Sequence, residues 1–62
     1  MATTRAKQPT EFPFYVNIVG KSEADGAMKG FDTEAVAKLD CDDRNYRAEE
    51  MGISARYEVR KS

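Results

Sequence analysis

The sequence contains no histidine and no tryptophan, and its single cysteine is Cys41. One cysteine excludes a disulfide within the chain, and the lack of histidine removes both a general base near neutral pH and a common zinc ligand. The sequence also has no G-x-S-x-G motif, no phosphate-cradling glycine loop and no paired-cysteine metal motif. We therefore expect a protein that is not an enzyme and binds no cofactor or metal.

Long apolar runs are also missing. No segment approaches the roughly 20 apolar residues of a membrane span, and the N-terminal stretch lacks the apolar centre of a secretory signal. These features, with the unpaired cysteine, predict a soluble cytoplasmic protein with no membrane partner. The 62 residues suffice for one domain with a small core.

Charge is unevenly distributed along the chain. Residues 23–50 hold nine acidic and four basic residues, whereas residues 1–22 and 51–62 each carry an excess of two basic residues. The net charge of −1 therefore hides an acidic centre between two basic ends. The acidic centre is the first feature that points to a binding surface.

Alternating apolar residues predict strands at both ends of the domain. In the segment 12–20, Phe14 and Val16 point to one side of an extended chain with Phe12 and Ile18, and Pro13 delays pairing until Phe14. The alternation in 53–60 predicts another strand. Between them, a turn at Asp25-Gly26 predicts a short strand over 27–31, and the alternative is a loop over 21–31.

The acidic segment 32–51 predicts one helix. Asp32 suits the N-cap position, Phe31 and Val36 have the spacing of a hydrophobic staple, and Gly52 is a typical stop. The stripe expected to face the sheet consists of the larger apolar residues of the helix, which are Val36, Leu39, Tyr46 and Met51. Asp43 and Glu50 interrupt this stripe. A second, smaller strip consists of Ala37, Cys41 and Ala48.

Together these elements predict an α+β fold. Its order is strand, strand, helix, strand, with a three-stranded antiparallel sheet of order 2-1-3 and the helix on one face. The domain spans 12–62, and residues 1–11 are expected to be a disordered N-terminal arm.

The acidic helix is the first candidate contact surface. Its candidate residues are Asp40, Asp42, Asp43, Glu49 and Glu50. A negative surface of this kind attracts a basic partner and orients it. The alternative is a solvated helix stabilised by i, i+4 ion pairs, namely Glu34–Lys38, Asp40–Arg44 and Asp43–Arg47.

The sheet face away from the helix is the second candidate. Its candidate residues are Tyr15, Asn17, Val19, Arg56 and Arg60, and Glu58 lies among them. A tyrosine beside arginines could stack on a base or anchor a protein contact. The alternative is an ordinary solvated sheet.

These surfaces favour a small protein-binding module, an accessory protein or inhibitor that occupies a partner's surface. In size and architecture it is analogous to phage and mobile-element proteins that block host enzymes. The partner is expected to be a protein, itself basic or nucleic-acid-binding. The alternatives are nucleic-acid binding through Tyr15, Arg56 and Arg60, and a homodimer.

Overall fold

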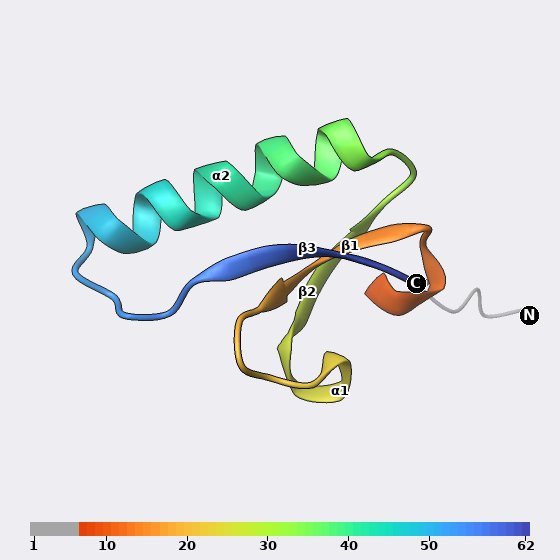
Figure 1. The fold of residues 1–62 in the computed structure, drawn as a ribbon, viewed down its shortest axis with the longest axis horizontal. Coiled ribbons are helices and arrows are strands. Elements are labelled where there is room, and N and C mark those ends of the chain that lie inside the picture. Colours follow the sequence, from red (N-terminus) through yellow and green to blue (C-terminus); the bar gives the residue numbers. More distant parts are fainter. Residues whose placement is uncertain (1–6) are drawn as a thin grey trace, which may run out of the picture.

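The computed structural model describes residues 7–62 and has one long helix lying on a small sheet (Figure 1). In chain order the elements are the 3-10 turn η1 (Pro9–Glu11), β1 (Phe14–Ile18), the short helix α1 (Glu23–Gly26), β2 (Ala27–Phe31), α2 (Glu34–Glu50) and β3 (Tyr57–Lys61). The predicted α+β fold is confirmed, with α1 as an additional turn of helix.

The sheet is antiparallel with the order β2-β1-β3, as predicted. In the central strand, Val16 lies between Lys29 of β2 and Val59 of β3, and its side chain is fully buried. A bulge follows Val16 on the β2 side, where Met28 is the extra residue. The third strand is shorter than predicted, because pairing with β1 begins only at Tyr57.

Helix α2 begins one residue later than the sequence suggested. Thr33, and not Asp32, is the N-cap: its hydroxyl accepts a hydrogen bond from the backbone N–H of Val36 at 3.3 Å. Since Phe31 is still paired with Phe14 in the sheet, Asp32 lies in the connection between β2 and α2 and is not the residue that directly precedes the helix. The predicted Phe31–Val36 staple spacing is lost with this shift.

The end of α2 is the glycine stop that the sequence predicts. Gly52 has φ +72°, its N–H donates to Glu49 O at 3.1 Å, and the N–H of Ile53 donates to Ala48 O at 2.8 Å. These two bonds form a Schellman motif, which satisfies carbonyls at the helix end.

The face of α2 that packs on the sheet is not the predicted one. Ala37, Cys41 and Ala48 are the buried residues of the helix, whereas Val36 and Leu39 are exposed. Because these helix side chains are small, the helix can lie close to the sheet. The larger side chains of the sheet then fill the space between the two layers without overpacking it. The expectation that the larger stripe faces the sheet is therefore wrong.

The other face of the sheet is also covered in part. Figure 1 shows α1 on the side of the sheet opposite α2. The Phe12 ring lies over Gly30, where an added methyl group would overlap it, and Gly30 pairs with Tyr15. Phe12 thus lies on the Tyr15 face and not on the same side as Phe14 and Val16, where the alternation placed it, since the extended strand starts only at Phe14, after η1 and Pro13.

The turn between β1 and α1 depends on a different glycine from the one expected. Gly20 has φ +87°, whereas Gly26 ends α1 with a negative φ. Gly26 is buried against Lys21, and a Cβ added to Gly26 would lie 2.8 Å from the Cβ of Lys21. The glycine is therefore needed for close approach and not for positive φ.

The predicted arm over residues 1–11 is only partly described. Residues 1–6 lie outside the described residues. Pro9–Glu11 form η1, which contacts β2 and β1, and the Oε2 atom of Glu11 accepts a hydrogen bond from the Gln8 N–H at 2.7 Å.

Candidate functional site

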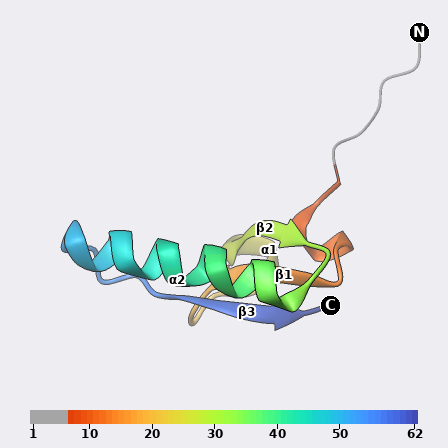
Figure 2. The same cartoon turned by 90° about the horizontal axis from the view of Figure 1, so that it is seen from above.

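The outward face of α2 carries an apolar ridge. The side chains of Leu39 and Tyr46 are 70% and 65% exposed, and Val36 is about half exposed in the same row. At about 100° per residue these three positions fall within a narrow arc opposite the buried strip of Ala37 and Ala48. Viewed from above, α2 lies in front of the sheet, and no other described element covers it (Figure 2).

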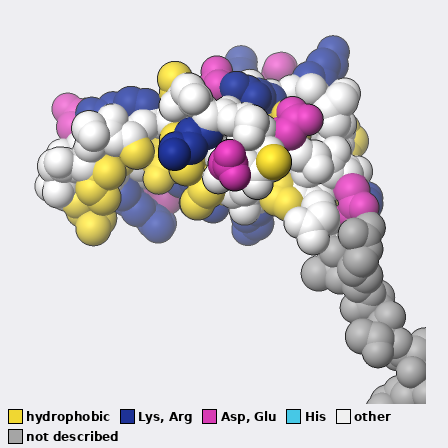
Figure 3. Space-filling view, turned by 90° about the horizontal axis from the view of Figure 1, so that it is seen from below, with side chains coloured by type: hydrophobic (Ala, Val, Ile, Leu, Met, Phe, Trp, Pro, Cys, Tyr) yellow, Lys and Arg dark blue, Asp and Glu magenta, His cyan; other side chains and the backbone are white. Residues whose placement is uncertain are grey.

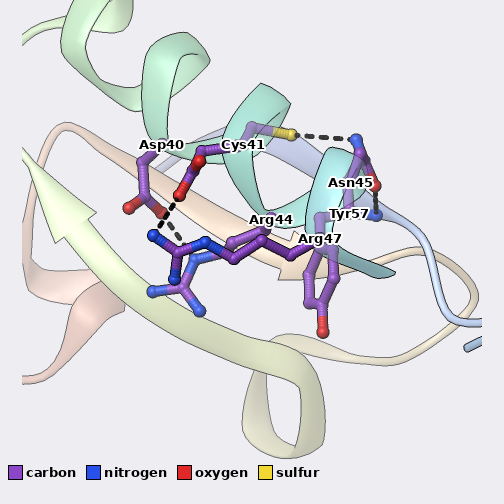
Figure 4. Close-up of polar contacts among 7 residues, drawn as sticks. Asp40, Cys41, Arg44, Asn45, Arg47 and Tyr57 are labelled. Atoms are coloured by element: carbon purple, nitrogen blue, oxygen red, sulfur yellow. Dashed lines mark hydrogen bonds and ion pairs between the residues drawn. The ribbon is translucent and has the colours of Figure 1, made fainter. Parts of the chain in front are cut away.

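Two of the five predicted helix carboxylates are held by arginines. Asp40 Oδ2 lies 2.6 Å from Arg44 Nε, and Asp43 Oδ2 lies 2.7 Å from Arg47 Nη2 (Figure 4). The Asp40–Arg44 pair is half-buried on the flank of the helix near the sheet, whereas the Asp43–Arg47 pair is exposed. Both are i, i+4 pairs of the kind predicted from the sequence.

The remaining three carboxylates are exposed and uncompensated. Asp42, Glu49 and Glu50 form no ion pair or hydrogen bond with another side chain among residues 7–62. The predicted Glu34–Lys38 ion pair is likewise absent from the described part of the chain. The unpaired part of the acidic surface therefore consists of these three groups, whereas Asp40 and Asp43 are held in ion pairs along the helix.

The structure buries two of the candidate sheet-face residues. Tyr15 is 3% exposed and Asn17 is fully buried. The Tyr15 hydroxyl donates to Glu23 Oε2 of α1 at 3.1 Å, and Asn17 Nδ2 donates to the carbonyls of Ile18 and Lys21, both at 2.9 Å. The expectation that these side chains lie on an open face is wrong, because the segment after β1 folds back over them.

The arginines predicted for this face are engaged within the chain. Arg56 precedes β3, and its Nη1 donates to the carbonyls of Ile53 and Ala55 at 2.8 Å. Arg60 donates to Glu58 Oε2 at 3.1 Å, and this hydrogen bond raises the pKa of Arg60. Of the five candidates, only Val19 is an exposed apolar side chain without such a contact.

The side of the molecule away from α2 has a mixed surface. Figure 3 shows basic and acidic side chains interspersed on it, with a group of apolar side chains at one end and no continuous field of basic side chains. A mixed surface of this sort lacks the clustered lysines and arginines of a nucleic-acid footprint. The five sheet-face residues therefore do not form one accessible site.

Cys41 is part of the core and not a reactive group on the surface. It lies on the buried face of α2, and Asn45 Nδ2 lies 3.7 Å from its sulfur (Figure 4). Burial raises the pKa of the Cys41 thiol, and the neighbouring Asp42 and Asp40 carboxylates raise it further. A thiol of this kind is mostly protonated at neutral pH and is a poor nucleophile.

The outward position of the ridge was not predicted from the sequence. The available signal was the spacing of Val36, Leu39, Asp43, Tyr46 and Glu50, which alternates between three and four residues. This is the seam pattern of a helix that packs against another helix. A large apolar stripe usually faces the core, and for this reason the same residues are expected to contact the sheet.

The described residues contain no pocket and no group of side chains arranged to hold a metal ion. Within residues 7–62, no helix combines the length and apolar character that crossing a bilayer requires. Comparison with protein-family models, with curated proteins and with solved structures yields no match for this chain.

Proposed function

We propose that this protein is a non-enzymatic protein-binding module that occupies a partner's surface with the outward face of α2. The observation that carries the proposal is the exposure of Leu39 and Tyr46 in one row on a rigid helix. Single exposed leucines are common on protein surfaces, but a row of large apolar side chains on one helix face is a typical partner site.

The rigidity of the helix supports this role. Thr33 caps its start, the Gly52 motif closes its end, and Asn45 ties its middle to the backbone of β3. Because the ridge is held in place before binding, little side-chain and backbone order has to be gained when a partner docks. An accessory protein or inhibitor that acts by covering a surface needs this property.

The sheet face is not part of the proposal. Tyr15 is buried and hydrogen-bonded to Glu23, and so it is not accessible for stacking on a nucleic-acid base. Arg60 is committed to Glu58 within β3. The nucleic-acid alternative thus loses two of its three residues, and no other observation favours it.

The proposal is tested by comparative affinity capture from the source cells. Immobilised wild-type protein is compared with Leu39→Ser and Tyr46→Ser, which alter the ridge, and with Met28→Ser, a matched control at an exposed apolar side chain on β2. We expect a protein retained by the wild type and by Met28→Ser, and lost from both ridge variants. Equal recovery on all four baits would contradict a role for α2.

A further inference from the structure

The outward face of α2 has the repeat of a coiled-coil seam with acidic residues built into it. Val36, Asp43 and Glu50 occupy one set of seam positions, and Leu39 and Tyr46 occupy the other. Both positions of the second set are exposed and apolar. The seam therefore offers apolar anchors on one side and carboxylates on the other, over a helix of 17 residues.

The two flanks of the seam also differ in charge, because unpaired acidic residues lie on one flank only. Asp42 and Glu49 lie on one flank, and neither has an ion-pair partner among residues 7–62. On the opposite flank, Asp40 and Arg47 are both engaged in pairs along the helix. Flanking charges of this kind select the partner and its direction in helix pairs.

A second copy of this chain fits the seam poorly. In an antiparallel pair that sets Leu39 of one helix opposite Tyr46 of the other, Asp42 of each copy faces Asp43 of the other. In a parallel pair, Asp43 faces Asp43 and Glu50 faces Glu50. Like charges brought together in this way oppose association, so the seam is not self-complementary.

Anionic surfaces are disfavoured for the same reason. Asp42, Glu49 and Glu50 repel the phosphates of a nucleic acid and the headgroups of an acidic membrane. The chemistry that complements this face is a protein helix with an apolar stripe and with lysine or arginine beside it.

Resting on the proposed function, we infer that the segment bound by α2 is a basic amphipathic helix, which lies along the seam. Its apolar residues pack against Leu39 and Tyr46, and its cations meet Asp42, Glu49 and Glu50. The apolar contacts supply most of the affinity, while the ion pairs set the direction and speed of association.

The test uses a synthetic helical peptide with leucine at every d position and lysine at the a, e and g positions. Two matched peptides carry glutamate or glutamine in place of lysine. Each is titrated into the isotopically labelled protein, and amide chemical shifts report where it binds. We expect the lysine peptide to shift the amides of α2 and to bind at least tenfold more tightly than the glutamine peptide at low salt.

Variants of the protein separate the two contributions. The double variant Leu39→Ala, Tyr46→Ala should bind the lysine peptide at least tenfold more weakly than the wild type does. In the neutral triple variant Asp42→Asn, Glu49→Gln, Glu50→Gln, the affinity for this peptide should lose most of its dependence on salt concentration. Met28→Ala, which alters an exposed apolar residue on β2, should change neither the affinity for the lysine peptide nor its salt dependence. Because all these side chains are exposed, the fold is expected to persist, and the spectra report this directly.

The other outcomes overturn the inference in distinguishable ways. If the glutamine or glutamate peptide binds α2 as tightly as the lysine peptide, the partner is not basic, while a protein-binding role for the ridge stands. If the α2 amides shift with protein concentration alone, the occupant is a second copy. If no peptide shifts the α2 amides, the inference fails, and the comparative capture decides the proposed function separately.

Discussion

The side-chain amide of Asn45 engages both backbone groups of Tyr57. Asn45 Oδ1 accepts from the Tyr57 N–H at 2.8 Å, and Asn45 Nδ2 donates to the Tyr57 carbonyl at 3.1 Å (Figure 4). Tyr57 begins β3, an edge strand of the sheet. The amide thus acts like one residue of a missing neighbouring strand, covering part of an edge and fixing α2 to the sheet.

Replacing Asn45 with alanine should lower the free energy of unfolding by about 1–3 kcal/mol, because two hydrogen bonds to the backbone are lost. Urea unfolding followed by circular dichroism measures the change. Lys38→Ala, at an exposed position of the same helix, is the control and should stay within about 0.5 kcal/mol of the wild type. Equal stabilities of the two variants would show that the Asn45 bridge contributes nothing.

The orientation of α2 can be tested by two opposite substitutions. Ala37→Leu should cost about 1–3 kcal/mol, because Ala37 is fully buried and the added side chain overpacks the layer between helix and sheet. Leu39→Ala should change the free energy of unfolding by less than about 0.5 kcal/mol, since Leu39 lies on the surface. Thermal or urea unfolding of both variants decides the matter, and a large loss in Leu39→Ala would support the orientation expected from the sequence.

Gly30→Ala should destabilise the fold by about 1–3 kcal/mol, because the added methyl group overlaps the Phe12 ring. A double-mutant cycle with Phe12→Ala identifies the cause. In the Phe12→Ala background the same change should cost clearly less, because the ring is gone. Additive effects of the two substitutions would mean that another contact makes Gly30 necessary.

Gly52→Ala should cost about 1–2 kcal/mol, because φ +72° is unfavourable for a residue with a Cβ. Gly52→Asn should cost less, because asparagine enters the left-handed region more readily. No atom outside the neighbouring residues lies within 4 Å of the site of the added Cβ, so steric overlap is not the cause. Comparing the unfolding free energies of the three proteins tests this, and equal losses for alanine and asparagine would argue against backbone strain.

Stability should decrease at alkaline pH through Cys41. Its thiol has a raised pKa in the folded protein, mainly because of burial, so the folded state holds the proton more tightly than the unfolded state does. The resulting stabilisation is fully present below the unfolded thiol pKa and is lost as pH rises through the folded pKa. Urea unfolding of the wild type and Cys41→Ala across this range should give curves that converge with rising pH; parallel curves would contradict the linkage.

Local patterns predicted most of the secondary structure. The alternation around Val16 predicted the central strand, and cap chemistry predicted the stop at Gly52. The strand after Gly26 was predicted in the right place, but the positive φ of this turn lies at Gly20 and not at Gly26. The N-cap was displaced by one residue, because Asp32 and Thr33 are both capable caps and pairing of Phe31 in the sheet decides between them.

The candidate surfaces were harder to predict. The i, i+4 pairs of Asp40 and Asp43 were foreseen, since their spacing is local to the helix. The burial of Tyr15 was not, because it depends on Glu23 and the fold-back of the segment after β1. A strand pattern shows which residues share a face, but it does not show what else covers that face.

Local signals in the sequence were enough to predict the strands and the long helix in their order along the chain, because hydrophobic spacing, caps and glycines act within a few residues. The side of α2 that meets the sheet depends instead on packing between segments that are far apart in the chain. The helix has two apolar strips, and the choice depends on the space above Val16 and on the bridge from Asn45 to Tyr57. Close packing favoured the small strip and left Leu39 and Tyr46 in solvent.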